Sequence, residues 1–122
     1  MPSETTFKDT VNKRIKFHNQ TTFTPYYRGT PDHWYSGKRD LWIEYKFVRS
    51  RPKFMSWKSL LDPLQYRWCK ARHAEGRSVW VMVGYKSNLE GFVLMSPRSI
   101  ISNIKPITVQ DLANKITRYC NE

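Results

Sequence analysis

The chain reads Asp-Leu-Trp-Ile-Glu-Tyr-Lys-Phe-Val over residues 40–48. Apolar and mainly polar side chains alternate along this run, which is the two-residue period of a β-strand. The face expected to be buried carries Leu41, Ile43, Tyr45 and Phe47. The opposite face carries Trp42, Glu44 and Lys46. Glu44 and Lys46 should therefore point in the same direction.

A second strand is expected immediately upstream. Gly37-Lys38-Arg39 predicts a tight turn between a strand at residues 33–36 and the strand at 40–48. Continuing this pairing one residue further places Asp32 opposite Glu44, with the side chains roughly 5 Å apart. Two carboxylates at that separation can share one Mg²⁺, which binds oxygen ligands at about 2.1 Å. The hairpin therefore predicts a divalent-metal site.

The overall charge makes these acids unusual. The chain has 21 Lys and Arg residues against 10 Asp and Glu, a formal net charge of +11, yet three of the ten acids fall within residues 28–46. A basic surface attracts polyanions, whereas a local group of acids suggests a metal ion. A metal held against a phosphate indicates a nuclease, in which Lys46 would stabilise developing negative charge or orient the attacking water. The alternative is that Glu44 and Lys46 simply form the solvated face of an ordinary strand.

Two other polar residues are expected to lie outside the metal site. Asp40 shares the face of Glu44, but four residues along a strand span about 13 Å, so the two cannot share one ion directly. We expect Asp40 to end the turn and to pair with Lys38 or Arg39. His33 falls on the opposite face of its strand, where a structural role or a DNA contact is expected.

The fuller pattern resembles a known family. Pro31-Asp32 followed by Glu44-Tyr45-Lys46 resembles the PD-(D/E)xK nuclease signature, and the surrounding sequence is similar to the virus-type replication-repair nuclease (VRR-NUC) and Holliday-junction-resolvase branches. A glycine precedes Pro-Asp, and the helical segment Leu61–Trp68 carries a glutamine in its first turn. Residues 75–83 match the turn into the next strand. The resemblance covers roughly residues 28–84.

Position by position, the resemblance implies a metal-dependent DNA endonuclease that uses Mg²⁺ or Mn²⁺. Its implied catalytic set is Asp32, Glu44, Lys46 and Gln65, with Asp32 and Glu44 as metal ligands. A glutamate from the first helix often completes the metal site, which points to Glu4, with Asp9 as its rival. Without the resemblance, Gln65 would be taken for an ordinary exposed helical glutamine.

The resemblance leaves the substrate open. One expectation is a structure-selective enzyme, similar to Holliday-junction resolvases, that cuts branched DNA as a homodimer. A second is a sequence-specific endonuclease of the homing or restriction type. Two non-enzymatic alternatives are an inert nucleic-acid-binding module and a partner-binding protein such as a phage-type inhibitor. By analogy of fold alone, a virus or a mobile element is the suggested source.

A basic segment follows the metal-site strand. Residues 48–58 mix four cations with two aromatic residues and a proline, a composition that can neutralise phosphates and stack on bases. The residues expected to contact nucleic acid are Arg28, Arg49, Arg51, Lys53, Trp57, Lys58, Arg67 and Arg72. The alternative is that Phe54, Met55 and Trp57 cover the sheet edge and that only the charges are exposed.

The rest of the chain predicts a scaffold. Helices are expected from Ser3 to near Phe17 or His18, from Asp62-Pro63 to Gly76 and from Thr108 onward. A loop or irregular strand is expected at 19–27, and strands at 78–85 and 91–95 with a loop at 86–90. The expected apolar positions of the last two helices are Leu64, Trp68 and Ala71, then Val109, Leu112, Ile116 and Tyr119. This order predicts one α/β domain over residues 1–122, with a central mixed sheet flanked by helices as in restriction endonucleases.

Composition sets the remaining expectations. With 39% hydrophobic residues and five tryptophans, the chain should fold around one core. It has no apolar run of about twenty residues and no signal-peptide pattern at its start, so a soluble cytoplasmic protein without a membrane partner is expected. Cys69 and Cys120 lack the spacing of a zinc site, and we expect two free, mostly buried thiols.

Overall fold

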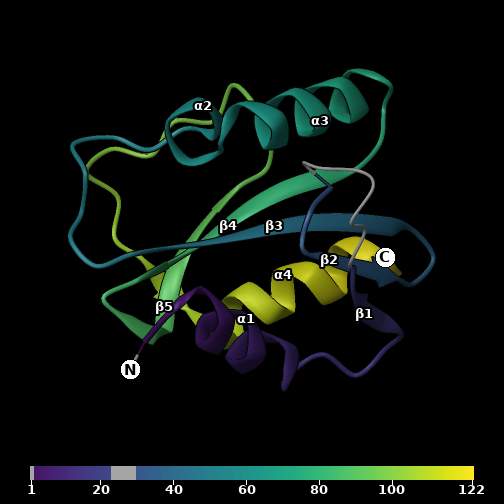
Figure 1. Ribbon diagram of the computed structural model, residues 1–122. Coiled ribbons are helices and arrows are strands. Elements are labelled where there is room, and N and C mark those ends of the chain that lie inside the picture. The colour runs from purple at the N-terminus through teal and green to yellow at the C-terminus, as the bar shows by residue number, and fades with distance from the viewer. Residues whose placement is uncertain (1, 23–29) are drawn as a thin grey trace.

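A six-stranded sheet forms the middle layer of the protein (Figure 1). The computed structural model describes residues 2–22 and 30–122. The helices are α1 (Glu4–Asn12), α2 (Trp57–Leu60), α3 (Pro63–Ala74) and α4 (Val109–Asn121). The strands are β1 (Asn19–Thr21), β2 (His33–Ser36), β3 (Asp40–Val48), β4 (Val79–Tyr85), β5 (Ser87–Leu94) and β6 (Ile107–Thr108).

The strands lie side by side in chain order, and the sheet is mixed. Neighbouring strands are antiparallel except for β3 and β4, which are parallel. A parallel pair requires a crossover connection, and α2 and α3 supply it on one side of the sheet. Helices α1 and α4 cover the opposite side (Figure 1). The prediction of one α/β domain with a mixed sheet between helices is confirmed.

Alternation along β3 divides the apolar side chains between two cores, one on each side of the sheet, where composition had predicted a single core. Leu41, Ile43 and Tyr45 are fully buried on the side of α1 and α4. Trp42 packs on the other side, against the cluster beneath α2 and α3. The buried members of that second cluster are Met55, Trp57, Leu61, Cys69, Val79, Val81, Val83, Phe92, Leu94 and Ile101. Glu44 and Lys46 share this face of β3 with Trp42, so their polar atoms need hydrogen-bond partners in the layer between the sheet and α3.

The predicted hairpin has the predicted register. His33 pairs with Ile43, and Ser36 pairs with Asp40, so the register extended by one residue places Asp32 across from Glu44. The turn requires glycine because a Cβ atom at Gly37 would lie 2.8 Å from the carbonyl oxygen of Cys120 at the end of α4. The turn thus packs directly against the last helix.

Helix starts follow the predicted caps. The Ser3, Asp62 and Thr108 side chains each accept a hydrogen bond from the backbone three residues ahead. In α3 the bond is reciprocal: Asp62 Oδ1 accepts from the Gln65 amide at 2.8 Å, and Gln65 Oε1 accepts from the Asp62 amide at 3.1 Å. Gly76, with φ of 87°, follows α3 in the left-handed region that favours glycine.

The first helix is shorter than predicted. It ends at Asn12 and not near Phe17 or His18. The Lys13 amide still bonds four residues back, to Asp9, but the amides of Arg14 and Ile15 bond to carbonyls three residues back, so the chain tightens and leaves the α-helix. Ile15 stays largely buried, which explains why the four-residue apolar spacing continued past the helix end.

The predicted loop at 86–90 is wrong, because β5 begins at Ser87 directly after a one-residue turn at Lys86, whose φ is 62°. Because β5 begins with polar residues, the sequence did not indicate a strand there. Asn88, for example, donates from Nδ2 to Thr10 Oγ1 at 2.9 Å, so a polar strand residue is used to hold α1. The short elements α2 and β6 were not predicted.

The apolar stripe predicted for α3 is also wrong in part. Leu64 is 41% exposed, and the fully buried residue of this helix is Cys69. The two cysteines are free and buried, as predicted. Of the segment expected to be a loop or irregular strand, residues 19–21 form β1, and 23–27 lie outside the described residues. Among the described residues, every helix is too short or too polar to cross a membrane.

Leu112→Ala tests the core beneath α4. Leu112 is fully buried, so the truncation should lower the free energy of unfolding by about 2–5 kcal/mol, measured by urea denaturation. Leu89→Ala is the matched control, because Leu89 is 60% exposed and should change stability by less than about 0.5 kcal/mol. Equal losses in the two variants would contradict the packing described here.

Candidate metal centre

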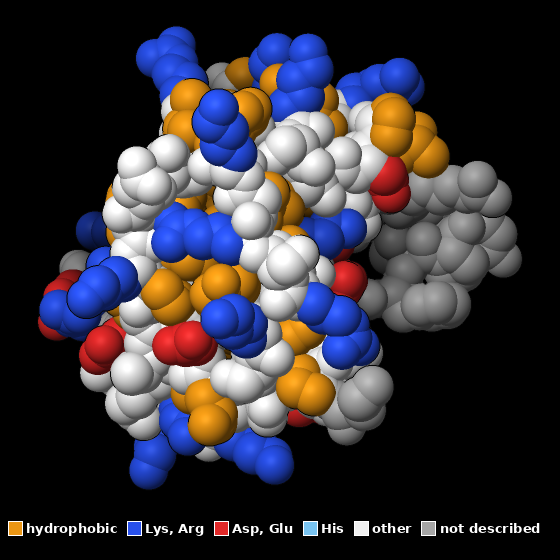
Figure 2. Space-filling model, turned by 90° about the vertical axis from the view of Figure 1, so that its left-hand side faces the viewer, with side chains coloured by type: hydrophobic (Ala, Val, Ile, Leu, Met, Phe, Trp, Pro, Cys, Tyr) orange, Lys and Arg blue, Asp and Glu red, His pale blue; other side chains and the backbone are white. Residues whose placement is uncertain are grey.

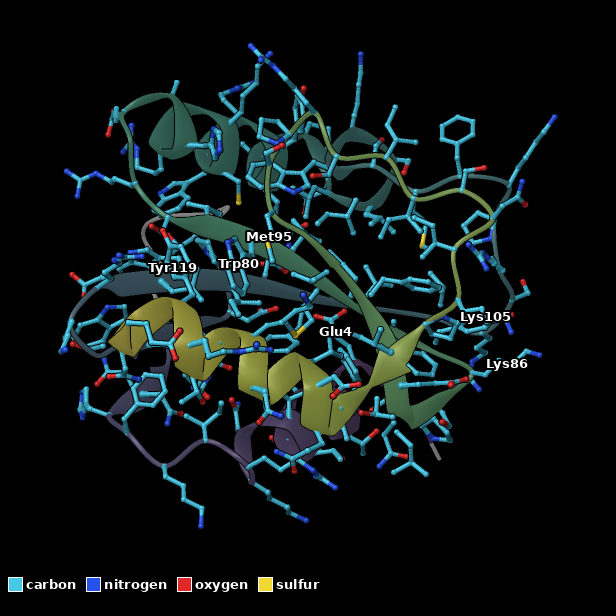
Figure 3. All side chains as sticks on the ribbon, turned by 180° about the vertical axis from the view of Figure 1, so that it is seen from behind. Glu4, Trp80, Lys86, Met95, Lys105 and Tyr119 are labelled. Atoms are coloured by element: carbon cyan, nitrogen blue, oxygen red, sulfur yellow. The ribbon has the colours of Figure 1, made fainter. Side chains whose placement is uncertain are left out.

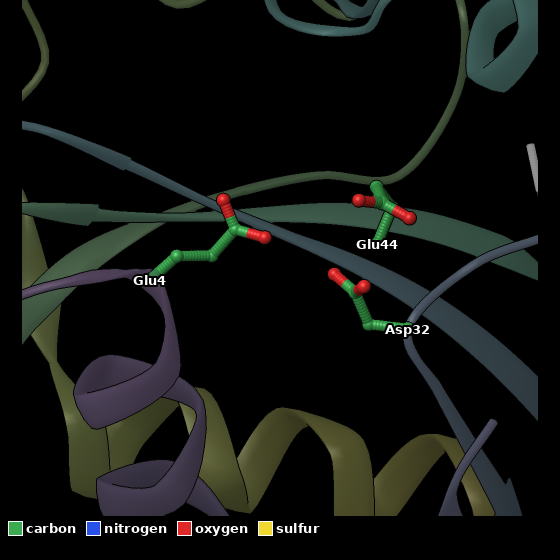
Figure 4. Close-up of side chains that lie close together, drawn as sticks. All are labelled: Glu4, Asp32 and Glu44. Atoms are coloured by element: carbon green, nitrogen blue, oxygen red, sulfur yellow. The ribbon is translucent and has the colours of Figure 1, made fainter. Parts of the chain in front are cut away.

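Three carboxylates from separate parts of the chain meet at one point (Figure 4). Glu4 is the first residue of α1, Asp32 precedes β2, and Glu44 lies in the middle of β3. One oxygen from each lies within 4.8 Å of the others. Glu4 is exposed, Asp32 is half-buried and Glu44 is only 1% exposed. The group therefore runs from the solvent into the protein.

Backbone contacts hold two of these acids in place. Glu44 pairs with Val81 of the neighbouring parallel strand, which explains its burial at the centre of the sheet. Asp32 Oδ2 accepts a hydrogen bond of 2.9 Å from the backbone amide of Tyr45, so the carboxylate is tied to β3 beside Glu44. The side chain of Asp32 is thus attached to β3 one residue beyond the last backbone pair of β2 and β3.

Lys46 and Gln65 join the same group through a short chain of hydrogen bonds. Gln65 Nε2 donates to Glu44 Oε2 at 3.0 Å, and Lys46 Nζ donates to Gln65 Oε1 at 2.8 Å. Lys46 Nζ also lies 3.7 Å from Glu44 Oε2. Because both ends of the Gln65 amide are used, the orientation of the amide and the position of the ammonium group are fixed together.

The environment opposes a negative charge on Glu44. Burial, together with the charge of Asp32 and a hydrogen bond with it, raises the pKa of Glu44 to about 9, and Lys46 only partly offsets this. Burial followed by the charge of Asp32 also raises the pKa of Glu4. Within the described residues, Glu44 Oε1 is buried without a hydrogen-bond partner. A proton, a cation or an ordered water can satisfy such an oxygen.

The donor set fits a divalent cation. Hard ions such as Mg²⁺ and Mn²⁺ prefer oxygen ligands, and three carboxylates with one unpartnered oxygen provide them. Asp9, the rival of Glu4, is exposed and belongs to no group of three possible ligands among the described residues. The structure therefore brings Glu4, and not Asp9, to Asp32 and Glu44.

Asp40 and His33 lie outside this group, as expected. Asp40 does not pair with Lys38 or Arg39 within the described residues; its Oδ1 accepts from the indole Nε1 of Trp34 at 3.2 Å. His33 is buried, with its ring nitrogens 2.6 Å from Asn19 Oδ1 and 3.3 Å from Thr21 Oγ1. Burial lowers the pKa of His33 to about 4. These contacts give His33 a structural role.

Some of the residues predicted to contact nucleic acid are placed elsewhere. Trp57 is 0% exposed and donates from Nε1 to the Leu94 carbonyl at 3.0 Å, so its predicted contact with nucleic acid is wrong. Arg51 and Arg72 are half-buried. Arg51 lies over the ring of Phe92, and Arg72 forms an ion pair with Glu75. Arg28 lies outside the described residues. The exposed members of the predicted set are Arg49, Lys53, Lys58 and Arg67.

Sequence reasoning missed three half-buried tryptophans beside the site, Trp34, Trp42 and Trp68. A signal for two of them was present. Trp34 and Trp42 each stand two residues from a site carboxylate, and strand alternation turns them to the same side of the sheet. Trp68 follows Gln65 by one helical turn, and this could be recognised only once α3 was placed over β3.

No protein-family model matches this chain, and no curated protein matches it significantly. The most informative residue of the site is Glu44, a buried acid with raised pKa and one unpartnered oxygen.

The raised pKa of Glu44 predicts how stability varies with pH in chelator. The folded state holds this proton more tightly than the unfolded state, so its contribution to stability is present at low pH and is lost between about 4.5 and 9. His33 acts in the opposite sense, but only below its ordinary value of 6.5. The free energy of unfolding should therefore fall from pH 6.5 to 9, and Glu44→Gln should flatten the curve.

Chemical denaturation across this pH range provides the measurement. Glu90→Gln, on β5, is the matched control and should keep the slope of the wild type. If Glu44→Gln keeps that slope as well, the pH dependence of the free energy of unfolding does not come from Glu44.

Proposed function

We propose that this protein is a metal-dependent DNA endonuclease of the PD-(D/E)xK type. The observation that supports this most strongly is the meeting of Glu4, Asp32 and Glu44, with a buried unpartnered oxygen on Glu44, beside the ammonium group of Lys46. A group of acids alone would suggest only metal binding. A lysine fixed next to it adds the positive charge that phosphodiester chemistry requires.

Each residue has a separate part in this proposal. Glu4, Asp32 and Glu44 would hold Mg²⁺ or Mn²⁺. When bound, the ion activates water and offsets negative charge on the phosphate. Lys46 presents its ammonium group beside the ligands, where it stabilises negative charge that develops on the phosphate. Gln65 holds Lys46 and Glu44 through the two ends of its amide, so it acts as a positioning residue.

The surface charge supports a nucleic-acid partner. Lys and Arg side chains are spread over the face shown in Figure 2, with fewer carboxylates among them. A pocket of about 710 Å³ on the outer side of α2 and α3 is lined in part by Lys58, Arg67 and Lys70. Lys86 and Lys105 add charge at the end of the sheet away from Trp80 and Tyr119 (Figure 3). Cations on several sides suit a long polyanion better than a small anionic substrate.

We infer a structure-selective enzyme, similar to Holliday-junction resolvases, as the first candidate. One site of this kind cuts one strand, so cleavage of both strands favours a homodimer. A sequence-specific endonuclease of the homing or restriction type is the alternative within the same chemistry. An inert binding module is less well supported, because it has no need of a buried acid with an unpartnered oxygen.

Cleavage of labelled DNA tests the proposal. The substrates are linear duplex, nicked duplex, flap, four-way junction and single strand, each with Mg²⁺, Mn²⁺ or chelator. We expect metal-dependent cutting that falls by roughly 10² or more in Lys46→Ala and Glu44→Gln, because each removes a charge acting at the phosphate or the metal. Lys16→Ala, an exposed lysine that the proposal does not use, is the matched control and should cut like the wild type.

Metal binding by calorimetry separates the possible causes of an inactive result. If the wild type binds Mn²⁺ and Glu44→Gln does not, the metal centre is supported, and the lack of cutting means that the right DNA substrate was not in the panel. The absence of any Mg²⁺ or Mn²⁺ site in the wild type would refute the proposal.

The salt dependence of DNA binding provides a second test. If six to ten phosphates are contacted, affinity should fall by roughly 10³ to 10⁵ between 50 and 200 mM salt, because each contact releases counterions. Fluorescence anisotropy in chelator measures this without cutting. Arg67→Ala and Lys58→Ala should each reduce the slope, whereas a slope near zero in the wild type would exclude DNA as the partner.

A further inference from the structure

We propose that Trp34, Trp42 and Trp68, the tryptophan row, form a stacking platform for unpaired bases. The substrate of the adjacent site is then DNA with a single-stranded segment. This inference rests on the proposed function, because it names the substrate class of the same site.

The three rings form a continuous series across the sheet. Trp34 and Trp42 are cross-strand partners whose ring centroids lie 6.0 Å apart with planes 24° from parallel. Trp68 of α3 meets Trp42 edge-on at 6.1 Å. At the other end, His18 lies edge-on to Trp34 at 5.4 Å. The row therefore joins β2, β3 and α3. Asp32 directly precedes β2, Glu44 lies on β3 and Gln65 lies on α3.

The row runs beside the carboxylates on the same side of the sheet. Trp42 precedes Glu44 by two residues, about 6.6 Å along the strand, and side chains two residues apart share a face. Trp34 follows Asp32 at the same interval, and Trp68 follows Gln65 by one helical turn. A base stacked on the row would thus belong to a nucleotide near the phosphate held at the metal centre.

Trp42 and Trp68 also pack against the core that contains Trp57, but the row differs from Trp57 in exposure. Trp57 is fully buried, and its indole nitrogen bonds to a backbone carbonyl. The three members of the row keep part of their surface in solvent. Aromatic residues that remain partly exposed in a connected series suit stacking, since every base offers a π-face.

Arginine side chains lie beside the row. The guanidinium carbon of Arg72 lies 5.6 Å from the ring centre of Trp68, and the same guanidinium forms an ion pair with Glu75. Beside Trp42 is a pocket of about 400 Å³, which two arginines, Arg39 and Arg77, line together with the single acid Asp40. Aromatic faces next to arginines are the combination that single-stranded nucleic acids require. In an intact duplex the base faces are already stacked on one another, so the row favours an unpaired segment.

Binding of labelled oligonucleotides in chelator tests the row without cutting. The probes are a single strand and a duplex of the same sequence, compared for wild type, Trp34→Leu and Trp34→Phe. We expect the wild type to prefer the single strand, and Trp34→Leu to weaken that binding roughly tenfold or more with little change for duplex. Because the indole is neutral, the salt slope should stay the same. Trp34→Phe should recover part of the affinity.

A matched control and a fold check accompany this comparison. The control is Tyr85→Leu, which removes a half-buried aromatic residue outside the row. Tyr85 lies on β4 six residues beyond Val79, the strand partner of Trp42, so this variant should bind like the wild type. Thermal melts show whether each variant is folded. If Trp34→Leu does not fold, Trp34→Phe and Trp68→Phe carry the test, and an unchanged single-strand preference in both overturns the inference.

The outcomes distinguish this inference from the proposed function. Single-strand binding that depends on Trp34, without metal-dependent cutting of gapped duplex, would support the row and refute the nuclease. Cutting of gapped and intact duplex at equal rates, unchanged in Trp34→Leu, would retain the nuclease and overturn the row. Absence of nucleic-acid binding, with Trp34→Leu reducing self-association, would assign the row to a protein contact and overturn the inference as well.

Discussion

The pairing of β2 with β3 is the constraint on which the rest of the site depends. It places Asp32 across from Glu44, and it places Trp34 across from Trp42 on the same side of the sheet. A slip of one residue would turn every side chain of one strand to the other face. The Gly37 turn prevents such a slip, because it lies against the end of α4 without room for a side chain. The contact between the Gly37 turn and the end of α4 therefore helps to keep Asp32 across from Glu44.

The burial of Glu44 has opposite effects on stability and on chemistry. With 1% of its surface exposed and one oxygen without a partner, this acid weakens the fold whenever it is ionised and no metal ion is bound. Burial also strengthens its attraction for a cation, since few waters compete. A fold that needed only stability would place an apolar residue at this position. The presence of a carboxylate there supports a functional reason.

Local patterns predicted most of the fold. Alternation in residues 40–48, the Gly37 turn and the caps at Ser3, Asp62 and Thr108 are short-range signals, and each element they predicted is present. The site depended on longer-range packing. Sequence spacing could not choose between Glu4 and Asp9, because the choice depends on how α1 docks. It also could not show that Trp57 is buried, because α2 and the core beneath it are defined only by tertiary contacts.

Gln65 connects the start of a helix to the site. Its Oε1 accepts from the Asp62 amide in the reciprocal cap of α3 and also accepts from Lys46, while its Nε2 donates to Glu44. Glutamate and glutamine serve equally well at this position of a capping box in ordinary helices. Here a glutamate would keep the cap but would exchange the donor to Glu44 for another negative charge. The helix start alone therefore tolerates two residue types, and the site beneath it narrows the choice to one.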